Sequence, residues 1–206
     1  MPRSAASAAP ATRARDPEGT RRKILAAALQ EFSAKGIDGA RVDAIAARAR
    51  VNKQLLYYYF GSKDGLFRAV LRERLAERAP EAAQADRASP TRLAELQDRL
   101  AGVRDWIRLL MWEALERSGR GPVEQEEIRR STLEGWVAAI EEAQANGALP
   151  AELDARQLVL TELGIVLFPL AFPQLTRLVT GHLPTSPEFL TERRTFLEEF
   201  GALLTR

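Results

Sequence analysis

The sequence predicts an all-α protein of about nine helices, with short helices in the first third of the chain and longer ones after it. Apolar side chains recur at helical spacing along most of the 206 residues, whereas the alternation that is typical of strands is nearly absent. Glycines, prolines and capping residues separate these apolar segments. With 46% apolar residues the chain can bury a substantial core.

The first two helices are predicted from repeats of the i, i+3, i+4, i+7 spacing. The first begins near Thr20 and ends at Gly36 and Gly39, and its apolar positions are Leu25, Ala28, Leu29 and Phe32. A shorter second helix follows with the same spacing, at Val42, Ile45, Ala46 and Ala49.

A third and a fourth helix follow a break at residues 50–52. Asn52 is well suited to cap the third helix, which carries Leu56, Tyr59 and Phe60 on one face. Gly61 ends this helix, and Ser62 caps a fourth helix that continues at least to Leu71.

The remaining helices are longer. Pro90 opens one, a stripe from Val103 to Leu110 marks another, and a long helix is expected from about Pro122 to Ala145. A markedly apolar helix over 154–172 precedes a last helix from Pro187 through Leu204.

Charge is distributed unevenly along the chain. Residues 1–70 hold 13 Lys and Arg against 6 Asp and Glu, whereas the rest of the chain is acidic, and the net charge is +2. A basic N-terminal part on an acidic remainder indicates that one end meets a polyanion. Arg3, Arg13 and Arg15 lie in a basic segment, 1–19, that either reaches a DNA minor groove or is a disordered tail.

The composition narrows the class of protein. There is no cysteine, and no segment reaches the apolar length of a membrane span, so we expect a cytoplasmic protein without a membrane partner. No catalytic constellation is visible, and His182, the sole histidine, stands in an expected loop. The pairs Glu126–Glu127 and Glu141–Glu142 indicate solvated helix faces. The sequence therefore predicts neither an enzyme, nor a metal site, nor a cofactor.

Two short helices joined by a tight turn and braced by a preceding helix form a helix-turn-helix. If Leu56, Tyr59 and Phe60 face inward, polar and aromatic side chains remain outside. Lys and Gln can read base edges, tyrosine hydroxyls suit phosphate oxygens, and Leu55 can touch a thymine methyl. Residues 53–60 thus have the make-up of a helix that enters the major groove.

The second to fourth predicted helices resemble the DNA-binding signature of the TetR/AcrR family. The residues that carry the resemblance are Ile45-Ala46 and Val51-Asn52-Lys53-Gln54-Leu55-Leu56-Tyr57-Tyr58-Tyr59-Phe60-Gly61-Ser62-Lys63-Asp64-Gly65-Leu66. The similarity covers about residues 20–68. It implies a DNA-binding domain over 20–68 and a helical effector-binding and dimerisation domain over 69–206. It also places Lys63 at the family's phosphate-contacting lysine, at a helix N-terminus.

Three positions depart from the family pattern. Arg50 replaces the turn glycine, and this weakens the expectation of a turn with a positive φ. Arg41 replaces a threonine that caps the second helix, and Gln54 replaces another glycine. Both arginines could contact phosphates, and Gln54 adds a base reader. The predicted DNA-binding residues are Arg41, Arg50, Asn52, Lys53, Gln54, Leu55, Tyr57, Tyr58 and Lys63.

For the second half of the chain the resemblance implies an architecture and not residue roles. Apolar side chains at helical spacing could line a pocket for a largely apolar small molecule, and the same spacing equally suits plain core. The pocket candidates are Trp106, Leu110, Met111, Trp112, Trp136 and Ile140. The polar candidates near them are Arg108, Glu113 and Glu116.

The last two helices are apolar over broader faces than one buried stripe requires. In the family, such helices form a four-helix bundle across a two-fold axis. The predicted interface residues are Leu160, Leu163, Leu167, Phe196, Phe200 and Leu203. A symmetric homodimer would present two recognition helices to a palindromic operator.

These observations predict a DNA-binding transcription regulator, a repressor that a small molecule releases from its operator. The leading alternative is a DNA-binding regulator without a small-molecule effector, either an activator or one controlled by a protein partner. A binding module with a vestigial helix-turn-helix and a helical enzyme are the remaining alternatives.

Overall fold

The computed structural model describes residues 16–83, 86, 89–116 and 123–205, and these residues form helices and connecting turns without a strand. The described part contains ten helices: α1 (Pro17–Gly39), α2 (Val42–Ala49), α3 (Lys53–Phe60), α4 (Lys63–Ala83), α5 (Arg92–Ala101), α6 (Arg104–Glu116), α7 (Glu126–Ala145), α8 (Ala155–Ala171), α9 (Pro173–Thr180) and α10 (Pro187–Leu204). The all-α prediction is confirmed. Arg3, Arg13 and Arg15 lie outside the described residues.

Several helix starts differ from the sequence prediction: α5 begins at Arg92 rather than at Pro90, and α7 begins at Glu126 rather than near Pro122. α1 begins at Pro17 rather than near Thr20, because the Asp16 side chain accepts a hydrogen bond from the Gly19 N–H and caps the helix there. α9 is an additional helix: it follows the predicted apolar helix over 154–172 and begins at Pro173, a position where proline's missing N–H is not needed.

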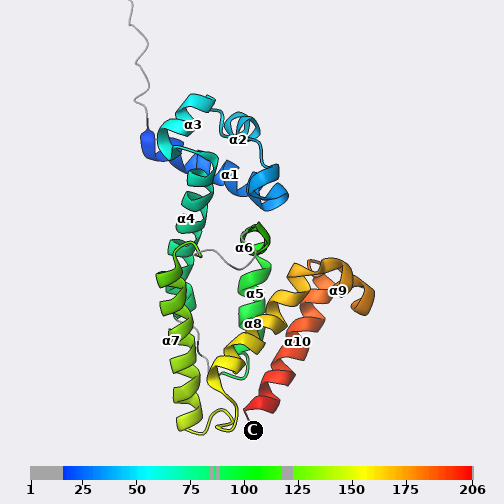
Figure 1. Ribbon diagram of the computed structural model, residues 1–206. Helices are drawn as coiled ribbons and strands as arrows, with labels where there is room; N and C mark the ends of the chain where they lie inside the picture. The colour runs from blue at the N-terminus through cyan, green and yellow to red at the C-terminus, as the bar shows by residue number, and fades with distance from the viewer. Residues whose placement is uncertain (1–15, 84–85, 87–88, 117–122, 206) are drawn as a thin grey trace, which may run out of the picture.

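Helices α1–α3 gather at one end of the molecule, and the long helix α4 leads away from them (Figure 1). α7 runs beside α4, whereas α5 lies between that pair and the α8–α10 side of the molecule. α9 turns away from α8 by 90° and projects from the body. By length and composition, no single described helix could cross a membrane; only α8 and α9 taken together as this bent pair meet that test.

The largest core cluster joins the two halves of the chain. Phe32, Ile45 and Leu56 from the first three helices pack with Phe67 of α4 and with Trp106 and Leu109 of α6. The predicted domain boundary after residue 68 falls inside α4, which is continuous to Ala83. The N-terminal half, α1–α3, and the helical half that follows therefore share buried apolar surface and are not joined by a flexible linker.

Two smaller clusters hold the remaining helices together. One packs α7 against α8 around Ile140 and Val159, and the other packs α5 against α10 around Leu93 and Leu197. Between α5 and α8, Arg92 donates to Glu162 at 2.7 Å, and both side chains are almost fully buried.

Candidate DNA-binding surface and its link to the helical half

Helix α3 lies with one face in the core and the other in solvent. Asn52 accepts a hydrogen bond from the Leu55 N–H at 2.7 Å and so caps the helix, as predicted. Leu56 is fully buried, and Tyr59 packs against the core. Tyr57 is exposed, and Tyr58 is 81% exposed. Burial of such an aromatic ring would ordinarily be favourable, so an exposed pair at this position is a feature of a binding surface.

The turn between α2 and α3 keeps a left-handed residue. Arg50 has φ 58° and ψ 44°, and its N–H closes the end of α2 on Ala46 and Ala47. The arginine made a positive φ less expected at this turn, and the structure corrects that expectation, because Arg50 has a positive φ. The left-handed conformation costs a non-glycine residue about 1–2 kcal/mol, which the packing of the surrounding helices offsets. The Arg50 side chain stays exposed beside α3.

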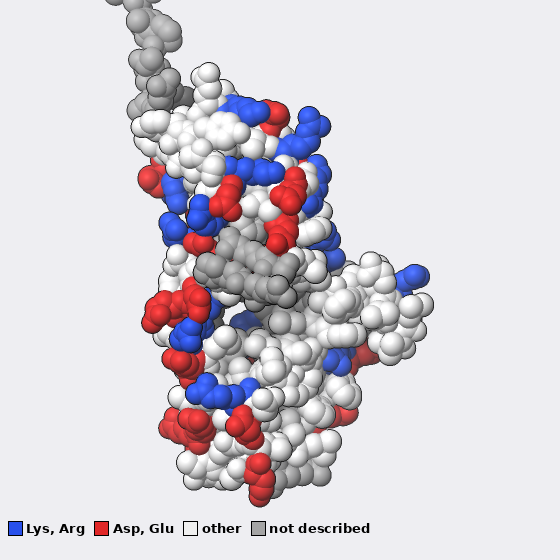
Figure 2. All heavy atoms as spheres, in the orientation of Figure 1, with Lys and Arg blue, Asp and Glu red and all other residues white. Residues whose placement is uncertain are grey.

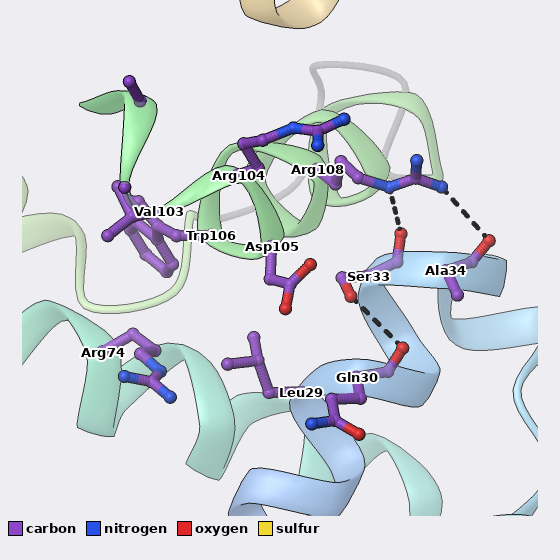
Figure 3. A pocket seen from close by; sticks show the side chains of 12 residues that line it. Leu29, Gln30, Ser33, Ala34, Arg74, Val103, Arg104, Asp105, Trp106 and Arg108 are labelled. Carbon is purple, nitrogen blue, oxygen red and sulfur yellow. Dashed lines mark hydrogen bonds between the residues drawn. The ribbon is translucent and has the colours of Figure 1, made fainter. Parts of the chain in front are cut away.

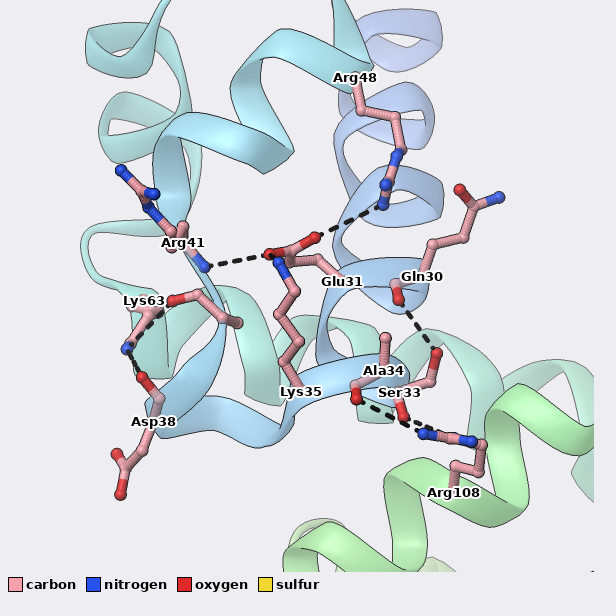
Figure 4. A network of polar contacts seen from close by, with 11 residues as sticks. Gln30, Glu31, Ser33, Ala34, Lys35, Asp38, Arg41, Arg48, Lys63 and Arg108 are labelled. Carbon is pink, nitrogen blue, oxygen red and sulfur yellow. Dashed lines mark hydrogen bonds and ion pairs between the residues drawn. The ribbon is translucent and has the colours of Figure 1, made fainter.

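A buried carboxylate from α1 anchors the start of α2. Arg41 precedes α2 and provides no side-chain cap; instead its N–H donates to Glu31 Oε1 at 3.3 Å (Figure 4). Lys35 donates to the same oxygen at 2.8 Å, and Arg48 of α2 lies 3.7 Å from the other. The hydrogen bond from Lys35 does most to hold the pKa of Glu31 below its ordinary value, against the effect of burial. Glu31 thus fixes the angle between α1 and α2.

Lys63, predicted to contact phosphate, lies at the first residue of α4. Its ammonium donates to the Asp38 carbonyl at 3.2 Å and to the Ala40 carbonyl at 3.4 Å (Figure 4). These bonds fasten α4 to the segment between α1 and α2. Lys63 therefore has a structural role that sequence reasoning did not anticipate.

The other predicted DNA-binding residues lie together on the outer side of α2 and α3. Arg41, Asn52, Lys53 and Gln54 are exposed, and Leu55 is half-buried. Lys53 forms an ion pair with Asp43 of α2 at 3.0 Å, and the hydrogen bond to Asp43 raises the pKa of Lys53 above its ordinary value. In the face drawn in Figure 2, basic and acidic side chains are interspersed over the end of the molecule formed by α1–α4, whereas the flank formed by α8 and α9 is largely uncharged.

Helix α6 is fastened to a break in α1. Gly36 has φ 69° and ψ −180°, and this interrupts the helical hydrogen bonding of α1. Three α6 side chains, one per turn, bind the backbone around the break. Arg108 Nε donates to the Ser33 carbonyl at 2.7 Å, and Trp112 Nε1 donates to the same oxygen at 3.3 Å. Glu116 accepts a hydrogen bond from the Ile37 N–H at 2.7 Å. We name Arg108, Trp112 and Glu116 the α6 stripe.

A cleft of about 660 Å³ opens beside the α6 stripe, between α1, α4 and the turn from α5 to α6. Leu29 and Trp106 line its apolar part, and Asp105 points into it (Figure 3). Its other lining residues are Gln30, Ser33, Ala34, Arg74, Ala101, Gly102, Val103, Arg104 and Arg108. Arg108 donates to the backbone carbonyls of both Ser33 and Ala34, so these three residues belong both to the cleft and to the contact between the two halves of the chain.

The structure does not bring the six predicted pocket residues into one cavity. Trp106 and Leu110 belong to the core shared with α1, whereas Trp136 and Ile140 belong to the α7–α8 cluster. Met111 and Trp112 are half-buried, and Trp112 bonds to α1. Of the polar candidates, Arg108 and Glu116 belong to the α6 stripe, and Glu113 pairs with Arg129 at 2.8 Å.

The six predicted interface residues all lie on α8 and α10. Leu160 is 64% exposed, Phe196 50% and Leu203 61%, whereas Leu163, Leu167 and Phe200 are half-buried. Further exposed apolar side chains continue the surface along α8, α9 and the turn that follows: Phe168, Phe172, Leu175, Leu178, Val179 and Leu183. A cavity of about 560 Å³ with mostly apolar walls lies between α8, α9 and α10.

Comparison with known proteins covers both halves of the chain. Residues 24–70 match the family of bacterial regulatory proteins, tetR family, and residues 93–201 match the tetracyclin repressor-like C-terminal domain. The HTH-type transcriptional repressor SCO4008 of Streptomyces coelicolor is 34% identical over 168 residues, 82% of this chain and 87% of that protein. The HTH-type transcriptional repressor NicS of Pseudomonas putida is 46% identical over 59 residues, 29% of this chain and 28% of that protein.

Solved structures agree with these matches. SCO4942 from Streptomyces coelicolor superposes with a TM-score of 0.73 at 31% identity, covering 89% of this chain and 97% of that one. GusR of Salmonella enterica shares the fold, with a TM-score of 0.65 at 22% identity over 95% of this chain and all of that one. The chain therefore belongs to the TetR family, and it is a DNA-binding transcriptional regulator and not an enzyme.

Proposed function

We propose that this regulator binds a palindromic operator as a homodimer, with α3 of each subunit in a major groove, and that it acts as a repressor. The observation that carries the proposal is the outer face of α3, where Tyr57, Tyr58 and Gln54 are exposed on a helix whose inner face is buried. We assign DNA contacts to the predicted set: Arg41, Arg50, Asn52, Lys53, Gln54, Leu55, Tyr57, Tyr58 and Lys63.

The proposed contacts divide by chemistry. Gln54 and Lys53 stand at the start of α3, where side chains reach base edges, whereas tyrosine hydroxyls and arginines suit phosphate oxygens. Lys63 lies at the N-terminus of α4, where the helix dipole also favours an anion.

Substitutions at Gln54 and Lys63 test this division. Selection of bound sequences from random DNA gives the operator, and Gln54→Ala is expected to change which operator is preferred. Lys63→Ala is expected to weaken binding to all duplexes and to reduce the slope of log affinity against log salt by about 0.9. Because Lys63 also donates hydrogen bonds to two backbone carbonyls, the Lys63→Ala variant should unfold at a lower temperature than the wild type. An unchanged base preference in Gln54→Ala would refute its role as a reader.

We propose that the homodimer forms through α8 and α10. Its support is the exposed apolar surface that includes Leu160, Phe196 and Leu203. Exposed apolar residues on a monomer usually stand singly, whereas a larger apolar surface is typical of an interaction site. Isologous pairing of this surface would set the two copies of α3 at a fixed spacing.

We further propose that a small molecule releases the operator by binding the cleft beside the α6 stripe. The cleft adjoins Ser33 and Arg108, whose hydrogen bond joins α6 to α1, so a ligand that shifts α6 also shifts the helices that carry α3. A ligand that prefers the shifted state must lower DNA affinity by the same factor by which DNA lowers the affinity for the ligand.

Filling the cleft tests the ligand site. Ala34 is exposed and lines the cleft, so Ala34→Trp is expected to occupy it while leaving operator binding within about threefold. An effector identified by operator release from the wild type should no longer release the Ala34→Trp variant. Continued release would place the effector elsewhere, and a lack of release of the wild type by any small molecule would favour a regulator without such an effector.

A further inference from the structure

We propose that Asp43, the acidic residue on the DNA-facing side of α2, is a specificity-determining residue that weakens binding to non-operator DNA. The inference rests on the proposed entry of α3 into the major groove, and it assigns to Asp43 a role that the family signature does not include. Asp43 is the sole acidic residue between Arg41 and Gly61, a stretch that contains four basic residues.

The position of Asp43 supports a role at the DNA surface. It lies in the first turn of α2 with its side chain 63% exposed, and it pairs at 3.0 Å with Lys53, the first residue of α3, which is 49% exposed. The pair therefore joins the two helices of the helix-turn-helix on their solvent side. An ion pair between two such exposed side chains is easily exchanged for other partners.

An acid at the start of a helix also has a purely structural explanation, since it favours the helix dipole. In this chain the N–H of Arg41, the residue that precedes α2, is already bonded to Glu31, so the position where α2 begins does not depend on Asp43 alone. The carboxylate points to Lys53 and not back to its own helix. These contacts favour a role in DNA binding over a role in capping.

The electrostatic consequence differs between the two kinds of complex. On arbitrary DNA, binding depends on phosphate neutralisation, so Asp43 repels the backbone and keeps part of the Lys53 charge from the phosphates. On the operator, Lys53 can move to a guanine edge, and the freed carboxylate can accept a hydrogen bond from a cytosine amino group. Asp43 thus disfavours the wrong partner more than the right one.

The test measures affinity for the selected operator and for an unrelated duplex over a series of salt concentrations, using the full-length wild type and Asp43→Asn. Asp43→Asn keeps the shape of the side chain and removes its charge. We expect it to bind the unrelated duplex about 5–10-fold more tightly and to steepen the salt slope by about 0.9, the value for one further phosphate contact. The ratio of operator to non-operator affinity should fall several-fold.

Two further variants isolate the cause. In a Lys53→Met background, Asp43→Asn should change the salt slope by less than half as much, because no lysine is released. Glu77→Gln removes a carboxylate that pairs with Arg74 at 2.8 Å on α4, away from α2 and α3, and it should leave both affinities unchanged. Thermal unfolding of Asp43→Asn separates any loss of helix stability from the DNA effect.

The outcomes distinguish this inference from the proposed function. If the wild type binds its operator but Asp43→Asn matches it on both duplexes, the role of Asp43 is refuted and operator binding stands. Equal tightening on both duplexes would also refute a role in specificity. A wild type that binds no duplex at low ionic strength would instead refute the proposed function.

Discussion

Leu160→Glu is expected to convert a dimer into a monomer and to lower operator affinity by at least about 100-fold. Leu160 is 64% exposed in the single chain, so a glutamate there should disturb the folded subunit little. In a bundle of α8 and α10 helices, however, the same glutamate would be buried without a partner. A monomer binds one half-site and loses the gain from joining two, which is about 10²–10⁴ in affinity. Light scattering and operator titration measure both effects.

Leu115→Glu is the matched control for this substitution. Leu115 is 68% exposed on α6, outside the α8–α10 surface, so the same chemical change should leave the dimer intact. Phe196→Glu on α10 should reproduce the effect of Leu160→Glu, because both side chains belong to one apolar surface. A dimer that survives both substitutions would place the interface on another face.

The sequence predicted best where local chemistry decides the structure. The Asn52 cap, the buried Leu56 and the end of α3 at Gly61 all follow from the pattern of ten consecutive residues, and all three are confirmed. The last helix was predicted from Pro187 through Leu204 and begins and ends there. These elements can be predicted without knowledge of the tertiary structure, because helix caps and apolar periodicity depend on residues that are close in the sequence.

The missed features depend on residues far apart in the chain. Glu31 lies ten residues before the N–H that it accepts from, and Glu116 lies 79 residues after Ile37. Neither the burial of Glu31 nor the contacts of the α6 stripe can be predicted from a local pattern, since charged residues at helical spacing ordinarily indicate a solvated face. The six pocket candidates shared only a periodicity, and the structure places two of them in one core, two in another and two, Met111 and Trp112, in neither.

The α9 helix shows a different limit. Pro173 after an apolar run indicates a helix end, and it is also the residue best suited to begin the next helix. Eight residues are too few for periodicity to distinguish these alternatives. α9 buries Thr176, which donates to the Pro169 and Phe172 carbonyls, and leaves Leu178 and Val179 exposed. Hydrogen bonds from Thr176 to the end of α8 and to the residue between the two helices therefore define α9 more than its own apolar pattern does.

Gly36→Ala is expected to lower the free energy of unfolding by about 3–5 kcal/mol. The backbone at φ 69° and ψ −180° lies in a region that is essentially restricted to glycine, which contributes about 1–3 kcal/mol of strain. In addition, a Cβ at residue 36 would lie 2.6 Å from Glu116 Oε1 and 2.8 Å from the Trp112 ring, so both must move. At about 2–4 °C for each kcal/mol in a chain of this size, the melting temperature should fall by roughly 6–20 °C.

Gly147→Ala separates backbone strain from the contact with α6. Gly147 also has a positive φ, 79°, but a Cβ there would meet no atom within 4 Å, so about 1–2 kcal/mol is expected from conformation alone. The excess loss in Gly36→Ala then measures how tightly the α6 stripe packs on the break in α1. Because that contact joins the helical half to the helices that carry α3, the Gly36 variant should also bind operator more weakly at temperatures where it remains folded, whereas the Gly147 variant should not. Equal losses in the two variants would show that α6 does not pack tightly at this point, and the proposed route from the cleft to α3 would then fail.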